Sequence, residues 1–310
     1  MEWFIYSPVF YRFGEERGAN FLVYYAKKPI YQGTEEVSIS GKTLSDRAKF
    51  CLRKIQRTKV MEMQEDADKS RVLVIIPAYN EEENIGKVIA EIRACVGDIE
   101  IVVINDNSSD NTAIVAKEAG VNVINLPHNL GYGGAVQTGF KYAISKGYEY
   151  GVQIDGDGQH DPHSMKDLLK VVQSGEADAA IGSRFLGSIQ YRIPFFRRLG
   201  MAIFGRIVSW IIKQRISDPT SGYQALNQKV MKFFAYDNYP SDYPDADTLI
   251  LLHFAGFKIK EIPVVMRERQ FGKSMHTQLK SLYYIYKMFL AIFILLLQRK
   301  KIQRGENNGS

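Results

Sequence analysis

Two aspartates separated by a single glycine carry the strongest chemical signal in the sequence. They stand in the run DGDGQH, which directly follows an apolar segment ending at Ile154. At the end of a strand, Asp155 and Asp157 can both turn toward one point, and Mg²⁺ or Mn²⁺ prefers such oxygen ligands. Gln159 and His160 could add a further ligand or a contact to a phosphate. A plain Asp-Gly turn is the competing explanation.

Two further carboxylates follow predicted strands. Glu81 belongs to PAYNEEEN, where Pro77 ends an apolar run and Asn80 is expected to cap the next helix. At that helix N-terminus, Glu81 can accept hydrogen bonds from a base or a ribose, although ordinary capping is an equally good explanation. Asp106, in INDNSSDNT, leaves the second strand toward the same crevice and is expected to play a similar part. The polar residues that follow it, 108–110, are expected to cap the next helix.

A glycine-rich segment, HNLGYGGA at residues 128–135, resembles a phosphate-cradling loop. Its spacing matches neither the Walker loop nor the dinucleotide-binding fingerprint. We therefore expect its glycines, Gly134 among them, to let a helix N-terminus pack closely beside the donor substrate.

The elements that must position these residues alternate between strand and helix. Continuous β-branched runs predict buried strands, and apolar residues at helical spacing predict amphipathic helices. Strands are predicted at 72–76, 101–104, 121–124, 150–154, 179–182 and 258–265, and helices at 82–96, 109–119, 133–145 and 162–172. This alternation predicts an α/β fold with a mainly parallel sheet, whose ligands bind beyond the carboxyl ends of the strands.

Composition narrows the class of protein. The chain has 310 residues, of which 45% are hydrophobic, and this excludes a disordered protein. Its net charge of +6 admits nucleic acid, phosphorylated small molecules or an anionic membrane as partners. Two isolated cysteines fit neither a disulfide framework nor a zinc site, and the first residues do not form a secretory signal. Residues 1–70 differ from the rest and form an N-terminal segment without assigned chemistry.

Six motifs, taken in their order along the chain, resemble glycosyltransferase family 2. They are PAYNEEENI, INDNSSDNT, HNLGYGGAVQTG, DGDGQHDP, GSRFLG and SDPTSGYQA. The later ones are most similar to the dolichyl- or polyprenyl-phosphate mannose or glucose synthase branch. The resemblance covers residues 71–276 as a catalytic domain and leaves 277–310 as a C-terminal helix and tail. It implies a GT-A fold, in which a mainly parallel central sheet is flanked by helices.

The resemblance also implies roles for individual residues. Those matching the nucleotide-binding positions are Pro77, Tyr79, Glu81 and Asp106, and those matching the metal and diphosphate site are Asp155, Asp157 and Gln159. Arg184 matches an arginine near the sugar and phosphates, Asp218 lies in the acceptor-side loop, and Arg269 matches an arginine that holds phosphate. With Asp157, these three are the predicted catalytic residues.

Two departures from the family pattern concern charge near the acceptor. Gln224 stands where the family often has arginine, and Ser274 is followed by Met275 instead of lysine. Lys273 could supply the missing charge and is assigned to donor binding.

Two apolar stretches predict contact with a membrane. Residues 193–216 alternate large apolar side chains with arginine and lysine, and residues 282–297 are apolar but too short for a span of about 20 residues. Such helices suit an anionic membrane surface, so we expect peripheral attachment to the cytoplasmic face. Packing on the domain, a membrane-protein partner and a homo-oligomer contact are the alternatives.

Together, these features predict inverting, divalent-metal-dependent transfer of a hexose from GDP-mannose or UDP-glucose to a polyprenyl or dolichyl phosphate. The acceptor phosphate is already ionised near neutral pH and needs no strong base. One alternative is transfer to a saccharide hydroxyl in cell-surface polysaccharide synthesis, with Asp218, Asp245 or Asp247 as the base. A sugar nucleotidyltransferase is disfavoured because PAYNEEEN replaces the expected glycine- and arginine-containing loop. No nucleic acid partner is expected, because no recognised binding motif appears.

Overall fold

The computed structural model describes residues 71–189, 195–236, 239–240, 244–268 and 278–303. The N-terminal segment 1–70 lies outside the described residues, as do Arg269, Lys273 and Met275.

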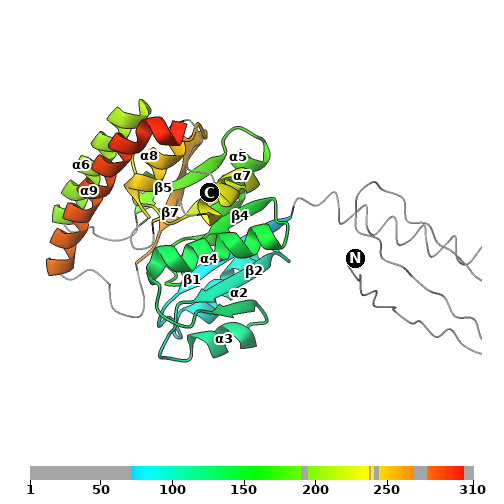
Figure 1. Cartoon of the computed structure of the whole chain (residues 1–310). Helices are drawn as coiled ribbons and strands as arrows, with labels where there is room; N and C mark the ends of the chain where they lie inside the picture. The colour runs from blue at the N-terminus through cyan, green and yellow to red at the C-terminus, as the bar shows by residue number, and fades with distance from the viewer. Residues whose placement is uncertain (1–70, 190–194, 237–238, 241–243, 269–277, 304–310) are drawn as a thin grey trace, which may run out of the picture. The chain divides into compact units, whose positions relative to one another are not determined.

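A seven-stranded sheet forms the centre, in the order β3-β2-β1-β4-β6-β5-β7 (Figure 1). The strands are β1 (Val72–Ala78), β2 (Glu100–Asn105), β3 (Asn122–Asn125), β4 (Tyr150–Gln153), β5 (Ala179–Ile189), β6 (Gln224–Asn227) and β7 (Ile259–Met266). Strand β1 pairs in parallel with β2 and β4, β2 with β3, and β5 with β7. Only β6 runs antiparallel to its two neighbours, β4 and β5, within the described sheet. The predicted mainly parallel sheet is confirmed.

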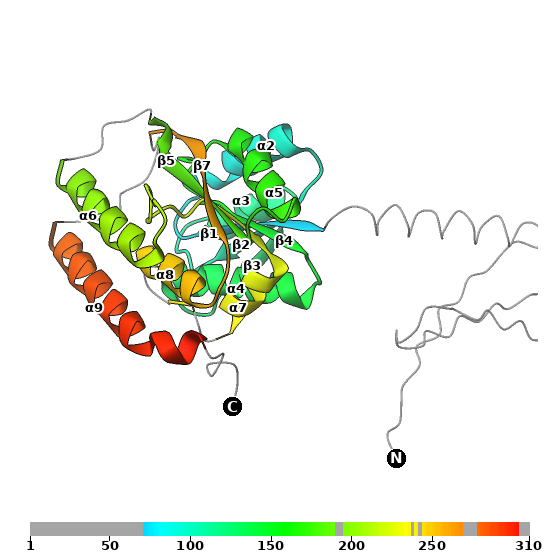
Figure 2. The same ribbon diagram turned by 90° about the horizontal axis from the view of Figure 1, so that it is seen from above.

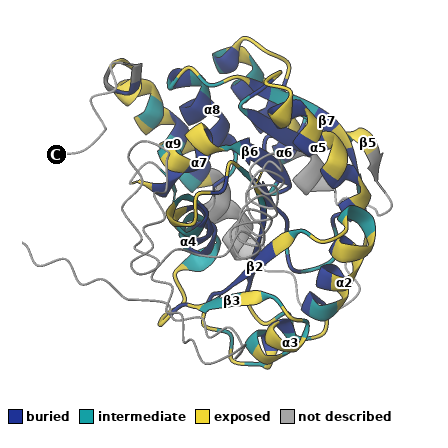
Figure 3. Cartoon of the chain, turned by 90° about the vertical axis from the view of Figure 1, so that its right-hand side faces the viewer, coloured by how far each residue is buried: buried dark blue, intermediate teal, exposed yellow. Residues whose placement is uncertain are grey.

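Helices cover both faces of the sheet. They are α2 (Ile85–Val96), α3 (Thr112–Glu118), α4 (Gly131–Ser145), α5 (Met165–Gln173), α6 (Phe195–Ile212), α7 (Gln228–Ala235), α8 (Ala246–Phe254) and α9 (Gln278–Gln303), with a 3₁₀ turn at Pro162–Ser164 before α5. Figure 3 shows the buried residues gathered on the sheet and on the helix faces turned toward it.

Strand β1 shows how the sequence builds these two layers. Successive side chains of a strand point to opposite faces. Leu73 and Ile75 accordingly join the core cluster that includes α4, α7 and α8, whereas Val74 and Ile76 join the cluster with α2 and α5. A β-carbon at Gly139 of α4 would lie 2.3 Å from Cγ2 of Ile75, so only glycine allows α4 to approach β1 this closely.

The two predicted amphipathic segments form α6 and most of α9, which lie side by side next to α8 (Figures 1 and 2). Val208 of α6 and Ile292 of α9 are buried in the same core cluster. The rings of Phe204 and Phe289 join the two helices, with centroids 5.2 Å apart. In the part of the chain that the structure describes, no helix combines the length and apolarity needed to cross a membrane.

One local prediction is wrong. Asn80 does not cap α2, because that helix begins only at Ile85, after Asn84. Asn80 instead has a positive φ of 55°, and its Oδ1 accepts a hydrogen bond from the backbone N of Ser109 at 2.9 Å. Its side chain therefore ties the loop after β1 to the loop after β2.

Candidate active site

The site is built at the carboxyl ends of β1, β2 and β4, as expected for ligands of an α/β sheet. These three parallel strands end side by side, and the backbone N of Asp106 donates to the carbonyl of Ala78 at 2.9 Å. The loop after β4 lies against the end of β1, since a β-carbon at Gly156 would be 3.4 Å from the carbonyl oxygen of Pro77. The sequence motifs that follow the three strands are therefore brought to one edge.

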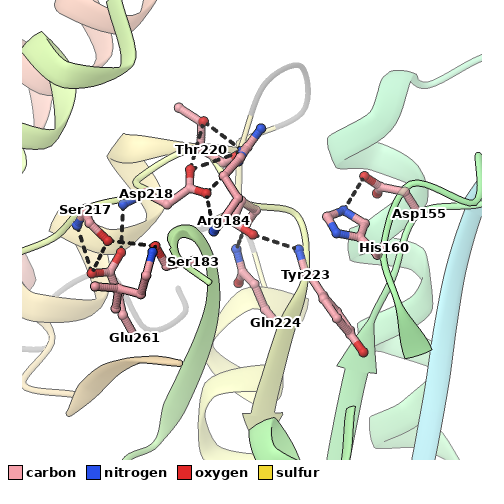
Figure 4. A network of polar contacts seen from close by, with 12 residues as sticks. Asp155, His160, Ser183, Arg184, Ser217, Asp218, Thr220, Tyr223, Gln224 and Glu261 are labelled. Atoms are coloured by element: carbon pink, nitrogen blue, oxygen red, sulfur yellow. Dashed lines mark hydrogen bonds and ion pairs between the residues drawn. The ribbon is translucent and has the colours of Figure 1, made fainter. Parts of the chain in front are cut away.

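Asp155 is held by two side chains, one on each carboxylate oxygen. The hydroxyl of Tyr132 donates to Oδ1 at 2.6 Å. Nε2 of His160 lies 3.2 Å from Oδ2, a contact that Figure 4 shows. Burial opposes ionisation of Asp155, but these contacts and the charge of Arg184 outweigh it and hold the pKa of this carboxyl below its usual range. Asp155 is therefore a carboxylate with a fixed orientation, and its ionised form is favoured.

Of the residues that orient Asp155, His160 is buried and Tyr132 is partly buried, and Tyr132 is itself held by the buried Gln153. Gln153 Nε2 donates to the Tyr132 hydroxyl at 2.8 Å. Burial and the nearby Asp155 charge raise the pKa of Tyr132 well above its usual value, so its hydroxyl stays protonated and donates. His160 is 3% exposed, and its ring lies 5.0 Å from the ring of Tyr223. No described residue hydrogen-bonds to Nδ1 of His160.

Asp157 and Gln159 form the turn that follows. The backbone N of Gln159 donates to Oδ1 of Asp157 at 3.0 Å, and Gly158 between them has a φ of +75° that favours glycine. The carbonyl of Gln159 accepts from the backbone N of Arg267 at 2.7 Å. Arg267 also pairs with Asp161 at 3.0 Å. The turn is thereby fixed to the end of β7.

The donor set suits a hard divalent cation. Each carboxylate oxygen can accept more than one bond, so Asp155 can bind a metal while it keeps its hydrogen bonds. The described residues contain no group of three or more carboxylate, histidine or cysteine side chains close enough to enclose an ion. Mg²⁺ and similar ions commonly take one or two carboxylates and complete their shell with water and substrate phosphates. Asp155 and Asp157 fit that pattern.

Asp106 secures the glycine-rich loop. Its Oδ1 accepts from the backbone N of Leu130 at 2.7 Å, and its Oδ2 accepts from Gly131 at 3.0 Å. Burial raises the pKa of Asp106, against the opposing effect of these two N–H groups. Gly134 lies close by, where a β-carbon would come within 2.7 Å of Cβ of Leu130. Asp106 thus fixes the start of α4, and its predicted contact with a base or ribose stays a prediction.

The other predicted nucleotide-binding residues lie at the end of β1. Pro77 is within the strand, and the side chain of Tyr79 is 45% exposed, so it is available to a ligand. Glu81 is held by its backbone N, which donates to Oγ1 of Thr112 at 2.8 Å, and by its Oε2, which accepts from Asn84 at 2.8 Å. The structure therefore places these residues together at one edge.

Arg184 and Asp218 form a buried ion pair across the site (Figure 4). Oδ2 of Asp218 accepts from Nε of Arg184 at 2.6 Å, and Oδ1 accepts from Nη2 at 3.1 Å. Nη2 of Arg184 also donates to the carbonyl of Thr220 at 3.0 Å. Two predicted catalytic residues thus hold each other, and Arg184 also holds the loop that contains Asp218 and Thr220.

Asp247 is a second buried carboxylate near this region. Burial raises its pKa to about 6, although backbone N–H groups of Asp245 and Thr248 oppose the change by donating to Oδ1 at 3.0 and 2.9 Å. Burial and the charges of three carboxylates raise the pKa of the Tyr239 hydroxyl well above its usual value, and these carboxylates are Asp247, Asp245 and Asp155. The sequence pointed to Asp245 and Asp247. Tyr132 lies in the glycine-rich segment 128–135, but the sequence did not indicate its contact with Asp155, and it did not indicate Gln153 or Tyr239 at all.

Gly222 brings the loop that contains Asp218 into contact with Asp155. A β-carbon there would lie 2.5 Å from the Tyr132 hydroxyl and 3.2 and 3.3 Å from the two carboxylate oxygens of Asp155. The loop can approach Asp155 this closely only because residue 222 lacks a side chain.

We expect Gly222→Ala to lower the free energy of unfolding by about 1–3 kcal/mol, because the added methyl group overpacks a buried contact. Urea denaturation measures the change. Gly200→Ala is the matched control, since a β-carbon at Gly200 meets nothing within 4 Å and alanine is favoured in a helix. Equal stability of the two variants would show that Gly222 is not tightly packed.

Comparison with known proteins identifies the family. The model of glycosyl transferase family 2 matches residues 73–237, more than half of the chain. A polyprenol monophosphomannose synthase of Mycolicibacterium smegmatis is 32% identical over 214 residues, which cover 66% of this chain and 80% of that protein. An undecaprenyl-phosphate mannosyltransferase of Micrococcus luteus is 29% identical over 219 residues, which cover 66% and 86%.

A solved structure shares the fold. It is glucosyl-3-phosphoglycerate synthase from Mycobacterium tuberculosis in complex with Mn²⁺ and uridine-diphosphate-glucose. Its TM-score is 0.56 at 20% sequence identity, and the match covers 77% of this chain and 82% of that one. The GT-A architecture predicted from the sequence is confirmed. The chain belongs to glycosyl transferase family 2 and is a glycosyltransferase.

Proposed function

We propose that the protein transfers a hexose, with inversion, from a nucleotide diphosphate sugar of the GDP-mannose or UDP-glucose class to a polyprenyl or dolichyl phosphate. The observation that carries the proposal is the orientation of Asp155 by Tyr132 and His160 at the carboxyl edge of the sheet, with Gly222 of the proposed acceptor-side loop in contact with it. The two relatives from Mycolicibacterium smegmatis and Micrococcus luteus, both polyprenyl-phosphate mannose transferases by name, support a lipid phosphate as acceptor.

In this proposal, Asp155, Asp157 and Gln159 hold a divalent cation, Mg²⁺ or Mn²⁺. Bound there, the cation would offset the negative charge of the departing nucleoside diphosphate. The structural neighbour was solved in complex with Mn²⁺ and uridine-diphosphate-glucose, which supports this assignment. Pro77, Tyr79, Glu81 and Asp106 form the nucleotide side, and Gly134 lets α4 begin close to it.

The acceptor side needs little base catalysis. A phosphate monoester is largely ionised near neutral pH, whereas a sugar hydroxyl would have to lose its proton to a carboxylate. Asp218 is engaged by Arg184 through both of its oxygens, which suits a residue that positions the loop more than one that accepts a proton. Arg269 and Lys273, which lie outside the described residues, are proposed to contact phosphate.

An exposed apolar surface supports a membrane location. We call it the apolar ridge, and its exposed members are Ile203 and Trp210 of α6 with Tyr286, Phe289, Leu290, Phe293, Ile294, Leu296 and Leu297 of α9. Trp210 is 79% exposed and Leu297 is 70% exposed, far more than such side chains usually are. Large exposed apolar patches mark interaction sites.

The charges on these helices favour an anionic bilayer as the partner. Exposed basic residues on or just after α6 and near the end of α9 are Arg206, Lys213, Arg215, Arg299 and Lys300. Apolar side chains that insert beside cations are typical of helices lying in a membrane interface. We propose that residues 71–276 form the catalytic domain, that 277–310 associate with the membrane, and that the enzyme attaches peripherally at the cytoplasmic face.

We expect Phe293→Ser together with Leu297→Ser to reduce binding to vesicles of phosphatidylglycerol and phosphatidylcholine by about tenfold or more, because two inserting side chains are lost. Sedimentation of the full chain with vesicles measures this. Ile114→Ser on α3, where Ile114 is 55% exposed and distant in the fold from α9, should bind like the wild type. If the double variant binds vesicles normally and instead dissociates an oligomer, the ridge is a subunit interface.

Incubation with labelled GDP-mannose or UDP-glucose and undecaprenyl phosphate tests the acceptor. An organic-extractable, acid-labile sugar product is expected. A product that forms only with an added oligosaccharide would overturn the lipid acceptor and favour polysaccharide synthesis.

A further inference from the structure

Glu261, on β7, carries a cluster of hydrogen bonds that no sequence motif indicated. Its Oε2 accepts from the backbone N of Ser217 at 2.8 Å and from the Ser217 hydroxyl at 2.9 Å. Its Oε1 accepts from the backbone N of Asp218 at 2.7 Å (Figure 4). Hydrogen bonds to a carboxylate are among the stronger ones in proteins. Glu261 therefore fixes the backbone at the start of the segment 217–224, which we call the 217–224 loop.

The same end of the loop is tied to the neighbouring strand. The hydroxyls of Ser183 and Ser217 lie 2.7 Å apart, and Asp218 is paired with Arg184. Ser183 and Arg184 belong to β5, which runs parallel to β7 in the register that sets Ile181 beside Glu261. Two adjacent strands thus hold the first two residues of the loop.

The far end of the loop reaches the metal-site carboxylate. Gly222 packs against Asp155, and the ring of Tyr223 packs against His160. The Tyr223 hydroxyl donates to the carbonyl of Asp161 at 3.2 Å. A few residues of backbone therefore connect the anchored start of the loop to Asp155.

We propose that Glu261 is a positioning residue for sugar transfer, which sets the 217–224 loop, and with it Arg184, relative to Asp155. This inference rests on the proposed function, in which the loop forms the acceptor side. Glu261 does not touch the reacting atoms. Its effect reaches them through Asp218 and Gly222.

Glu261→Gln isolates this role, because the amide group has nearly the same shape. All three groups that contact Glu261 donate hydrogen bonds, whereas an amide offers one acceptor oxygen and one NH₂ donor. One backbone N–H would then face another donor. Glu176→Gln is the matched control, since Glu176 contacts Lys260, the neighbour of Glu261 on β7, in an exposed ion pair.

Hydrogen exchange of the full-length variants tests, without any substrate, whether Glu261 anchors the 217–224 loop. For Glu261→Gln, we expect exchange of the backbone amides in 217–224 to accelerate about tenfold or more, while α2 and α5 keep their protection. Ser217→Ala, which retains both backbone donors, should cause a smaller change. Unchanged exchange in 217–224 would overturn the anchoring role.

Kinetics with undecaprenyl phosphate then separate positioning from general instability. For Glu261→Gln, the KM for the lipid phosphate should rise or kcat should fall by about tenfold or more, with the KM for the nucleotide sugar unchanged. The proposal would be contradicted if the KM for the lipid phosphate and the KM for the nucleotide sugar rose equally. A lowered Tm with normal kinetics would also contradict it. If the wild-type protein transfers no sugar, the proposed function fails, and the exchange result still decides whether Glu261 holds the loop.

Discussion

Asp157→Asn is expected to reduce sugar transfer by about a hundredfold or more, because stabilisation of the leaving group by a metal charge is worth several kcal/mol. The substitution preserves the local turn, since the amide oxygen can still accept from the backbone N of Gln159 as Oδ1 of Asp157 does at 3.0 Å. The substitution removes the negative charge of Asp157 and, in the proposed site, a carboxylate ligand of the metal. Initial rates at saturating substrate, together with the metal concentration that gives half-maximal rate, measure the effect.

The control for this experiment is Asp98→Asn, which removes the same charge from an exposed loop. That variant should keep the wild-type rate, and both variants should keep the wild-type Tm. Near-normal turnover of Asp157→Asn would remove this residue from the metal site and leave Asp155 as the only carboxylate of the pair with a role.

The second large effect concerns stability. Asp218→Asn should lower the free energy of unfolding by about 3–5 kcal/mol, because it removes the charged partner of the Arg184 guanidinium from a buried ion pair. The side chains of this pair are 5% and 0% exposed, so water cannot replace the lost partner. Chemical denaturation followed by far-ultraviolet circular dichroism gives the difference in the free energy of unfolding between the variant and the wild type.

An exposed ion pair provides the comparison. Glu176→Gln breaks the contact with Lys260, whose side chain is 42% exposed, and should cost at most about 1 kcal/mol. If Asp218→Asn were no more destabilising than this surface variant, Arg184 would have to be solvated or paired differently from the arrangement described above.

The sequence predicted the first half of the fold well, because buried parallel strands have a simple pattern. Val72–Ile76 is apolar throughout, and its side chains divide between two cores. Helix boundaries were less accurate. The predicted helix from Glu82 begins at Ile85, since the residues between them form a turn tied to the loop after β2.

Three elements of the second half were not predicted. Strand β6 has only four residues, QALN, and its place between β4 and β5 depends on antiparallel pairing with distant segments. Helix α7 had a usable signal, because Asn227 precedes it and its Oδ1 accepts from the backbone N of Val230. Helix α8 is buried on almost every side, so its apolar run shows no helical periodicity.

The sequence pointed to the candidate metal ligands but not to the residues that hold them in place. A carboxylate pair after a strand is visible as a motif, whereas Tyr132, Gln153 and Glu261 gain their roles only from contacts across the fold. Arg184 and Asp218 were each identified from a motif, but nothing in the sequence indicated that they pair with each other. Spacing along the chain carries little information about such distant contacts.

The most direct test of the metal-dependent transfer is the rate of lipid-linked sugar formation by the purified full-length protein after removal of divalent ions with EDTA. We predict that transfer from the active nucleotide sugar to undecaprenyl phosphate stops in EDTA and returns when excess Mn²⁺ or Mg²⁺ is added. Transfer that continues at the same rate without any divalent ion would contradict the role assigned to Asp155 and Asp157.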